Sequence, residues 1–173
     1  MTKVKNVLIT GGLGGIGINI CSLFIKDHNV IIVDNLPSKS FSKKLSDHTI
    51  INNKNIILYK KIDLTKTSQI KNLFHELKMK FSSIDVLINC AGIQHLSSVE
   101  NFSEKMWERV ISVNLSSSFY TSKYALPLMK KNKWGRIINI ASTHGLVASV
   151  NKSGYVASKH GMIGLTKTIA LET

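Results

Sequence analysis

The sequence predicts an α/β fold in which helices cover both faces of one doubly wound, parallel sheet. Short runs of Val, Ile and Leu alternate with longer segments whose apolar residues recur at helical spacing. The short runs are apolar throughout, which is typical of strands buried on both faces, as in parallel sheets. A glycine-rich turn joins the first apolar run to the first helical segment. The 173 residues are predicted to form a single domain.

Five apolar segments are the predicted strands. The first is closed by the pair Gly11 and Gly12, and the second ends at Asp34. Segments of this length and composition, separated by helical segments, indicate strands joined by helical crossovers. The predicted strands span residues 4–10, 30–34, 56–59, 85–89 and 136–142.

Four helices are predicted around these strands. The first follows the glycines, because apolar residues recur at helical spacing from Ile18 to Ile25. Residues 37–47 are expected to form a polar loop and a weak helix. The other helices are expected at residues 66–80, at 103–130 with Pro127 near the end, and at 153–173.

The charge and the composition exclude several function classes. The chain has 23 Lys and Arg against 10 Asp and Glu, a formal net charge of +13, but only Arg109 and Arg136 are arginines. Proteins that read nucleic acid depend on the bidentate guanidinium, so nucleic-acid binding is not expected. No apolar run is long enough to span a membrane or to resemble a signal peptide. Cys21 and Cys90 have no metal-ligand spacing, which predicts two core thiols in a cytoplasmic protein without a metal site.

The glycine-rich turn, TGGLGGIG at residues 10–17, predicts a dinucleotide site. Gly12, Gly14 and Gly17 fit one spacing, while Gly11, Gly15 and Gly17 fit the variant TGxxxGxG. In either register the backbone can approach a pyrophosphate, which accepts hydrogen bonds at the positive end of the following helix. The alternative is a merely flexible turn.

Asp34 predicts the choice of dinucleotide. It ends the second strand about 20 residues after the glycines, where a carboxylate binds the ribose hydroxyls of NAD and repels the extra phosphate of NADP. No Arg lies nearby in the sequence to bind that phosphate, although Lys39 could. NAD is therefore the expected cofactor, although Asp34 taken alone is equally a turn residue.

Ser142, Tyr155 and Lys159 form the candidate catalytic group. Tyr155 and Lys159 lie four residues apart on the last predicted helix and so share a face. An adjacent ammonium stabilises a phenolate, which makes a tyrosine an effective proton donor and acceptor. Ser142 follows the fifth strand, on the side where ligands bind such sheets. By spacing alone, the Tyr and Lys pair also fits an ordinary helix surface.

These residues together resemble one family, the short-chain dehydrogenases and reductases, over the whole chain. The matching segments are TGGLGGIG at 10–17, Asp34, Asp63 in IDLT, NCAG at 89–92, Asn114 in VNL, Ser142, Tyr155 and Lys159. The resemblance implies a Rossmann-type sheet with strand order 3-2-1-4-5. Cys90 stands where the family has a second Asn, and a small residue is tolerable there.

The resemblance also implies roles for individual residues. Tyr155 is the acid and base, Lys159 activates it and binds the nicotinamide ribose, Ser142 polarises the substrate oxygen, and Asn114 supports a proton relay. Asp63 meets the adenine, and Asn89 and Gly92 line the cofactor floor. The implied cofactor-binding set is Thr10, Gly11, Gly15, Ile16, Gly17, Asp34, Asp63, Leu64, Asn89, Ala91, Gly92, Tyr155 and Lys159. Without the resemblance, Asp63 and Asn89 are strand-end turn residues and Asn114 a helix-bend residue.

Within the family, residues 91–95 and 141–153 resemble members that oxidise D-3-hydroxybutyrate to acetoacetate with NAD. In those members the positions of Gln94, His144 and Lys152 hold the substrate carboxylate. An amide, an imidazole and an ammonium suit an anion. The implied substrate site therefore contains Gln94, Ser142, His144, Lys152 and Tyr155, and the implied substrate is a small hydroxyacid or ketoacid.

The C-terminal end departs from the family. The last predicted helix runs to Thr173, whereas family members continue into a sixth strand, a loop that contacts nicotinamide, a substrate lid and a seventh strand. The chain is therefore expected to be C-terminally truncated, with its fifth strand left at a sheet edge. Three interpretations follow: a dehydrogenase, a weak or inactive NAD-binding fragment, or a piece completed by a second chain. A homo-oligomer is expected if the chain folds.

Overall fold

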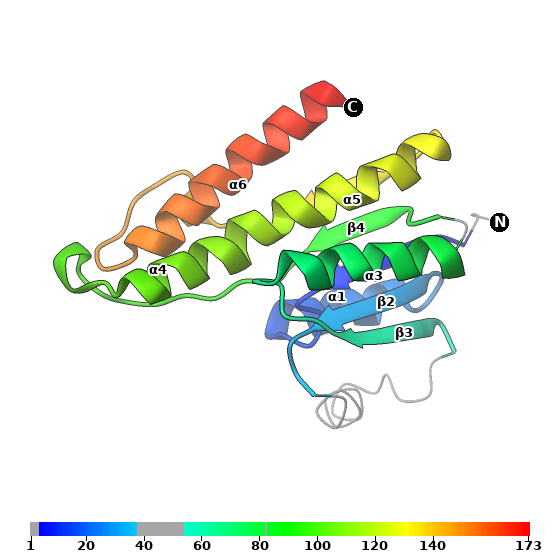
Figure 1. The fold of residues 1–173 in the computed structure, drawn as a ribbon, viewed down its shortest axis with the longest axis horizontal. Helices are drawn as coiled ribbons and strands as arrows, with labels where there is room; N and C mark the ends of the chain where they lie inside the picture. The colour runs from blue at the N-terminus through cyan, green and yellow to red at the C-terminus, as the bar shows by residue number, and fades with distance from the viewer. Residues whose placement is uncertain (1–3, 38–53, 82) are drawn as a thin grey trace.

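The computed structural model describes residues 4–37, 54–81 and 83–173, which contain one sheet of five parallel strands (Figure 1). The strand order is β3-β2-β1-β4-β5, which confirms the predicted fold class and order. The strands are β1 (Asn6–Thr10), β2 (Asn29–Asp34), β3 (Ile56–Lys61), β4 (Val86–Asn89) and β5 (Arg136–Asn139). Most of the predicted loop and weak helix at 37–47 lies outside the described residues, as does Lys39.

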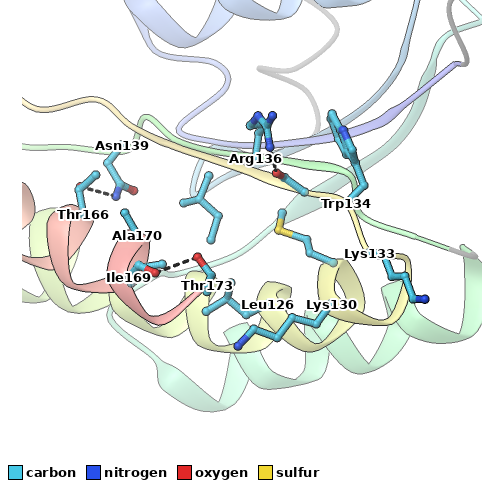
Figure 2. Close-up of a pocket in the computed structure, with 13 residues that line it drawn as sticks. Leu126, Lys130, Lys133, Trp134, Arg136, Asn139, Thr166, Ile169, Ala170 and Thr173 are labelled. Carbon is cyan, nitrogen blue, oxygen red and sulfur yellow. Dashed lines mark hydrogen bonds between the residues drawn. The ribbon is translucent and has the colours of Figure 1, made fainter.

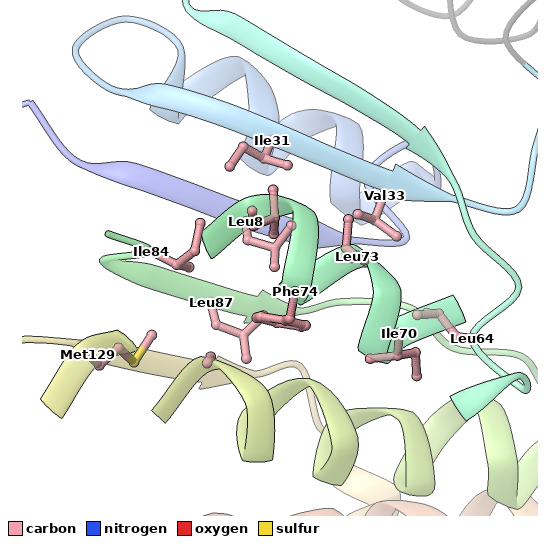
Figure 3. Packing of buried hydrophobic residues seen from close by; sticks show 12 residues of the cluster. Leu8, Ile31, Val33, Leu64, Ile70, Leu73, Phe74, Ile84, Leu87 and Met129 are labelled. Atoms are coloured by element: carbon pink, nitrogen blue, oxygen red, sulfur yellow. The ribbon is translucent and has the colours of Figure 1, made fainter. Parts of the chain in front are cut away.

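Apolar packing on both faces of β1 holds the sheet together. Val7 and Ile9 face a cluster that includes Cys21, while Leu8 faces the opposite cluster with Leu87 and Phe74 (Figure 3). Successive residues of a strand point to opposite faces, so a strand can fill both clusters only when all of its residues are apolar. The continuous apolar composition of this strand therefore reflects its central position.

The helices form a layer on each face of the sheet. Helix α1 (Gly15–Phe24) contacts β1 and β2, while α3 (Thr67–Lys80) and α5 (Ser117–Lys131) pack against each other on the opposite face. Helix α4 (Glu104–Ile111) precedes α5, and α6 (Ser153–Glu172) packs against α4 (Figure 1). No helix in the described part of the chain has the length and apolar character needed to cross a membrane.

The predicted helix 103–130 is one helical run that contains a π-helical turn. This turn, Ser112–Ser116, lies between α4 and α5, and Asn114 lies inside it. The Asn114 side chain bonds to both backbone groups of Ile93, on a different loop. Helical periodicity cannot predict these hydrogen bonds, because the two residues are 21 positions apart. π-Helical turns of this kind are frequent at functional sites.

The fifth strand is shorter and less buried than predicted. It ends at Asn139 instead of residue 142. Within the described residues β5 pairs only with β4, so it lies at the sheet edge as expected. Ile138 is 43% exposed, although its register partner Ile88 on β4 is fully buried. A hollow of about 650 Å³ lies beside β5, between the C-terminal ends of α5 and α6 (Figure 2).

Candidate active site

A cavity of about 480 Å³ lies at the carboxyl ends of β1, β2 and β4. This is the edge where ligands bind open α/β sheets. Nine of the predicted cofactor residues line this cavity: Gly11, Gly15, Ile16, Gly17, Asp34, Asp63, Leu64, Ala91 and Gly92. No group of three or more His, Cys, Asp or Glu side chains that could hold a metal ion is found among the residues described.

The glycine turn brings backbone atoms against the cavity. Gly11 has φ +64°, and a Cβ there would lie 2.6 Å from the Cα of Ala91. A Cβ at Gly17 would overlap the carbonyl oxygen of Gly11, whereas a Cβ at Gly15 would meet nothing within 4 Å. Gly11, Gly15 and Gly17 all line the cavity, but Gly12 packs against Ile32. The structure therefore favours the TGxxxGxG register.

Helix α1 begins at the cavity. Its N-cap is Gly14, which has no side chain to satisfy the first backbone amides. Gly15, Ile16 and Gly17 form the first turn and line the cavity. Free amides at the positive end of a helix dipole make an anion site, which suits a pyrophosphate.

Asp34 lies between the glycine turn and its own loop. Its Oδ2 accepts a hydrogen bond from the Leu13 amide at 3.0 Å, and its Oδ1 accepts one from the Leu36 amide at 3.2 Å. The carboxylate therefore shapes the turn and lines the cavity at once. A carboxylate has about four acceptor positions, so further positions remain for ribose hydroxyls.

Asp63 forms a turn after β3 and also lines the cavity. Its Oδ1 accepts hydrogen bonds from the hydroxyl and the amide of Thr65, at 2.8 and 3.0 Å, which forms a turn after β3. These two bonds hold the pKa of the Asp63 carboxyl below its usual value, and the cations Lys66 and Arg109 contribute less. Asp63 also lines the cavity, so it remains an anion on the cavity wall.

Arg109 is a cavity residue that was not expected from the sequence. It lies in the last turn of α4 and is the only cationic side chain among those that line this cavity in the described structure. Val113, from the π-helical turn, lines the same wall. The sequence signal that could have indicated Arg109 is its spacing from Val113. The two residues are four positions apart and therefore share a helical face.

Thr10 and Asn89 lie beneath the cavity and do not line it. The Thr10 hydroxyl accepts hydrogen bonds from the amides of Cys90 and Ala91, at 3.2 and 3.4 Å. The Asn89 side chain is buried and bonds to Thr121 on α5 and to Asn139 on β5. Both residues support the cavity floor from below. Cys90, predicted as a core thiol, is half-buried and lines the cavity, whereas Cys21 is buried as expected.

Lys159 is buried at the junction of α6 and the sheet. Its Nζ donates a hydrogen bond to the carbonyl oxygen of Ile140 at 2.6 Å and lies 5.6 Å from the centre of the Tyr155 ring. Burial lowers the pKa of the ammonium, an effect that Cys90 partly opposes. Tyr155 and Lys159 therefore share a face of α6, as the spacing predicts.

Ser142 and His144 lie next to this pair. The Ser142 hydroxyl oxygen accepts a hydrogen bond from the His144 amide at 3.1 Å, and it lies 3.4 Å from the imidazole Nδ1. The His144 ring meets the Tyr155 ring edge to face, with 6.0 Å between centroids. Three sequence-predicted residues thus form one cluster after β5.

The other predicted substrate residues come from two loops that are joined. Lys152 forms an isolated bridge with Ser97, and the Ser97 amide donates to the Asn151 carbonyl oxygen at 3.0 Å. Gln94 is exposed three residues before Ser97. The contacts bring the two loops together without placing the Gln94 side chain against His144.

Asn114 is fully buried between the cavity loop and α6. Its Oδ1 accepts from the Ile93 amide at 2.8 Å, and its Nδ2 donates to the Ile93 carbonyl oxygen at 2.9 Å and to the Ser158 hydroxyl at 3.0 Å. Ser158 precedes Lys159, so Asn114 connects the cavity wall to the helix that carries Tyr155 and Lys159. Asn114 lies in the π-helical turn, so its position also agrees with the alternative expectation of a residue at a helix bend.

Comparison with known proteins gives a consistent result. A family model described as short chain dehydrogenase matches residues 5–173. The chain is 44% identical over 168 residues to a D-beta-hydroxybutyrate dehydrogenase of Rhizobium meliloti (strain 1021), covering 97% of this chain and 65% of the relative. It is 40% identical over 173 residues to the enzyme of the same name from Cupriavidus necator, covering 100% of this chain and 66% of the relative.

A solved structure gives the same likeness. The fold matches that of 4-hydroxyisoleucine dehydrogenase complexed with NADH with a TM-score of 0.85 and 37% identity, covering 97% of this chain and 67% of that one. The chain thus spans about two thirds of the length of the proteins it matches.

Proposed function

The chain belongs to the short-chain dehydrogenase family, and from this premise we propose that it is a single-domain, NAD-dependent oxidoreductase unit that oxidises D-3-hydroxybutyrate to acetoacetate. One observation carries the proposal: the catalytic cluster adjoins the cofactor cavity. A Cβ at Gly92, on the cavity wall, would lie 3.7 Å from the Lys159 Nζ. A proton-transferring group on α6 is therefore next to the space where a nucleotide fits.

The residues of the cavity suit NAD. The first turn of α1 offers amides to the pyrophosphate, and Asp34 offers acceptor positions to the ribose hydroxyls. Asp63 and Arg109 lie on the wall assigned to the adenine. The name of the matched complex, which contains NADH, agrees with this assignment. When bound, NAD accepts the hydrogen on the carbon being oxidised, as a hydride.

The chain's own residues handle the proton. The Ser142 oxygen accepts from the His144 amide, and the serine hydroxyl, which lies 3.4 Å from the imidazole Nδ1, is proposed to donate its proton to the substrate oxygen. Tyr155 takes the proton of the substrate hydroxyl as the carbonyl forms. Lys159 donates to the Ile140 carbonyl oxygen, and its Nζ lies 5.6 Å from the centre of the Tyr155 ring. Oxidation thus releases one proton to Tyr155 and one hydride to the cofactor.

The substrate carboxylate is proposed to bind His144, Lys152 and Gln94. His144 lies beside Ser142 and Tyr155, which places a carboxylate within a few bonds of the reacting carbon. The bridge between Ser97 and Lys152 holds the other two residues on adjoining loops. The names of the two relatives agree with this hydroxyacid.

The test is NADH formation by the purified chain given NAD and D-3-hydroxybutyrate. The variant Tyr155→Phe removes the hydroxyl and keeps the ring, so turnover is expected to fall by a factor of about 10²–10⁴. NADH binding, followed by fluorescence, is expected to be unchanged. Equal turnover in the two proteins would overturn the assignment of Tyr155.

A second candidate is an NAD-binding unit that turns over only after a further polypeptide covers β5. The exposed Ile138 and the hollow beside it favour this candidate, because central strands in the same sheet are fully buried. It predicts NADH binding without turnover by the chain alone. Turnover that depends on Tyr155 in a homogeneous sample of the chain would exclude this candidate. Light scattering on the same sample gives its molar mass and so tests the proposed homo-oligomer.

A further inference from the structure

The end of β5 holds α6 at two points. The side-chain amide of Asn139 donates to the Thr166 hydroxyl at 2.8 Å (Figure 2). The next residue, Ile140, accepts the Lys159 ammonium through its carbonyl oxygen at 2.6 Å. Lys159 and Thr166 are seven residues apart, about two helical turns, so they lie on the same face of α6. Two neighbouring residues at the end of β5 therefore bond to one face of α6, which also packs against α4.

The orientation of the Asn139 amide is set by its other neighbour. Its Oδ1 accepts a hydrogen bond from Asn89 at 2.8 Å, and Asn89 in turn accepts one from the Thr121 hydroxyl at 2.7 Å. The Thr166 hydroxyl donates to the Met162 carbonyl oxygen at 2.7 Å, which leaves its lone pair for Asn139. These hydrogen bonds form one series that runs from Thr121 on α5 to Met162 on α6, and each donor in it faces an acceptor.

Polar contacts matter here because the C-terminal half of α6 has little apolar support. Beyond Met162, which is fully buried, every residue of α6 is exposed or half-exposed. Ile169 and Ala170 face the hollow beside β5 and do not rest on a strand. The hydrogen bond from Asn139 therefore joins this half of the helix to the sheet, where the central strands are held by apolar packing.

We propose that Asn139 is a positioning residue that, through Thr166, keeps Lys159 and Tyr155 of α6 against the cofactor cavity. This inference rests on the function proposed above for Tyr155 and Lys159. Neither Asn139 nor Thr166 lines the cofactor cavity. Their effect passes through the helix, because rotating α6 moves Lys159 away from Ile140 and from the cavity wall at Gly92.

The proposal is tested by the rate at which acetic anhydride acetylates each lysine, read by peptide mass spectrometry. Thr166→Val removes the hydroxyl at nearly constant volume, and acetylation of Lys159 is expected to rise about fivefold, the population change for one lost hydrogen bond. Asn139→Ala is expected to act in the same way from the strand side. Lys26, exposed in the turn after α1, and Lys123, exposed on α5, serve as internal references and keep their wild-type rates.

Two controls separate positioning from general loosening. Thr166→Ser keeps the hydroxyl and is expected to restore the wild-type rate. Thr168→Val removes a hydroxyl that bonds only within α6, to Gly164, and is expected to leave Lys159 unchanged. An unchanged Lys159 rate in Thr166→Val, or an equal rise at every lysine, would overturn the proposal.

The readout requires neither cofactor nor substrate, so it is independent of the proposed function. Absence of NADH binding by the wild-type chain would contradict the function and leave the acetylation result standing. Where the chain turns over, Thr166→Val is expected to lower kcat, and Thr166→Ser is expected to restore it.

Discussion

The two ends of the sheet are stabilised by different forces. On the nucleotide side, Val7, Leu8 and Ile9 of β1 and the residues of β2 from Val30 to Val33 are fully buried. On the catalytic side, β5 alternates between exposed and half-buried residues. Asn139 donates a hydrogen bond to Thr166 of α6, and the Ile140 carbonyl oxygen accepts one from Lys159. The cofactor cavity therefore has an apolar base, whereas the half of α6 beyond Met162 has few buried apolar side chains and is bonded to the end of β5.

This difference indicates which half of the site responds to small changes. Losing one hydrogen bond costs about 1 kcal/mol, while deleting a buried branched side chain costs several times more. Regions with few buried apolar contacts also open locally at lower free energy. We therefore expect mutations near β1 to unfold the protein, and mutations near β5 to change its catalytic geometry while the fold survives.

The largest expected effect compares Ile88 with Ile138, which are register partners on β4 and β5. Ile88→Ala removes fully buried methyl groups and is expected to lower the free energy of unfolding by about 2–5 kcal/mol. Ile138→Ala removes a side chain that is 43% exposed and is expected to cost less than about 1 kcal/mol. Urea unfolding measures both values, and equal losses would remove the contrast between the two strands.

The next effect concerns the glycine turn. Gly17→Ala places a methyl group on the carbonyl oxygen of Gly11 and is expected to cost about 1–3 kcal/mol of unfolding free energy and to abolish NADH binding. Gly15→Ala is the matched control, because its Cβ would meet no atom of the described residues within 4 Å. It is expected to keep the stability and to weaken NADH binding only. Thermal unfolding and NADH fluorescence separate the two outcomes, and a stable Gly17→Ala protein that binds NADH would contradict this account.

A smaller effect is the pH dependence from Cys21. Burial raises the pKa of this thiol from 9.0 to about 12, with Cys90 contributing next. Above pH 9.0 the unfolded chain loses the proton while the folded chain keeps it, so stability that is complete below this pH is lost as pH rises. The loss is expected to approach about 1.4 kcal/mol per pH unit. Lys159 opposes it, because burial lowers its folded pKa and stability is gained as pH rises toward 10.5.

Cys21→Ala tests this dependence. Urea unfolding at several pH values between about 8 and 11 is expected to give a flatter profile in the variant than in the wild type. Cys90→Ala is the comparison, and a smaller change is expected because Cys90 is only half-buried. Parallel profiles for wild type and Cys21→Ala would show that the buried thiol is not the source.

The smallest effect concerns Arg109. Because this guanidinium lies on the cavity wall with Asp63, Arg109→Ala is expected to weaken NADH binding about threefold to tenfold, as for a cation stacked on a ring. Reduced nicotinamide mononucleotide, which lacks adenine, is expected to bind both proteins equally. Lys105→Ala removes another exposed cation of α4 and controls for net charge. Equal weakening of both ligands would place Arg109 away from the adenine.

Much of the site was predictable because its residues follow strands. Gly11, Asp34 and Ser142 each come directly after an apolar run, and parallel strands bring their carboxyl ends to one edge. The spacing of Tyr155 and Lys159 correctly placed them on one helical face. Thr10 and Asn89 were predicted among the cofactor-binding residues, but their side chains bond beneath the cavity and do not line it. The side chain of a residue at a strand end can point into the sheet as well as away from it.

The sequence by itself determined the element types, the buried parallel sheet and the edge at which the site lies, because burial and helical spacing are local patterns. Only the tertiary structure decided where the π-helical turn with Asn114 lies, how Arg109 reaches the cavity, and which side chain of β5 bonds to α6. These features depend on contacts between residues far apart in sequence, such as Asn89 with Asn139 across 50 positions. No local pattern encodes such a contact, because its geometry exists only after the strands and helices have packed.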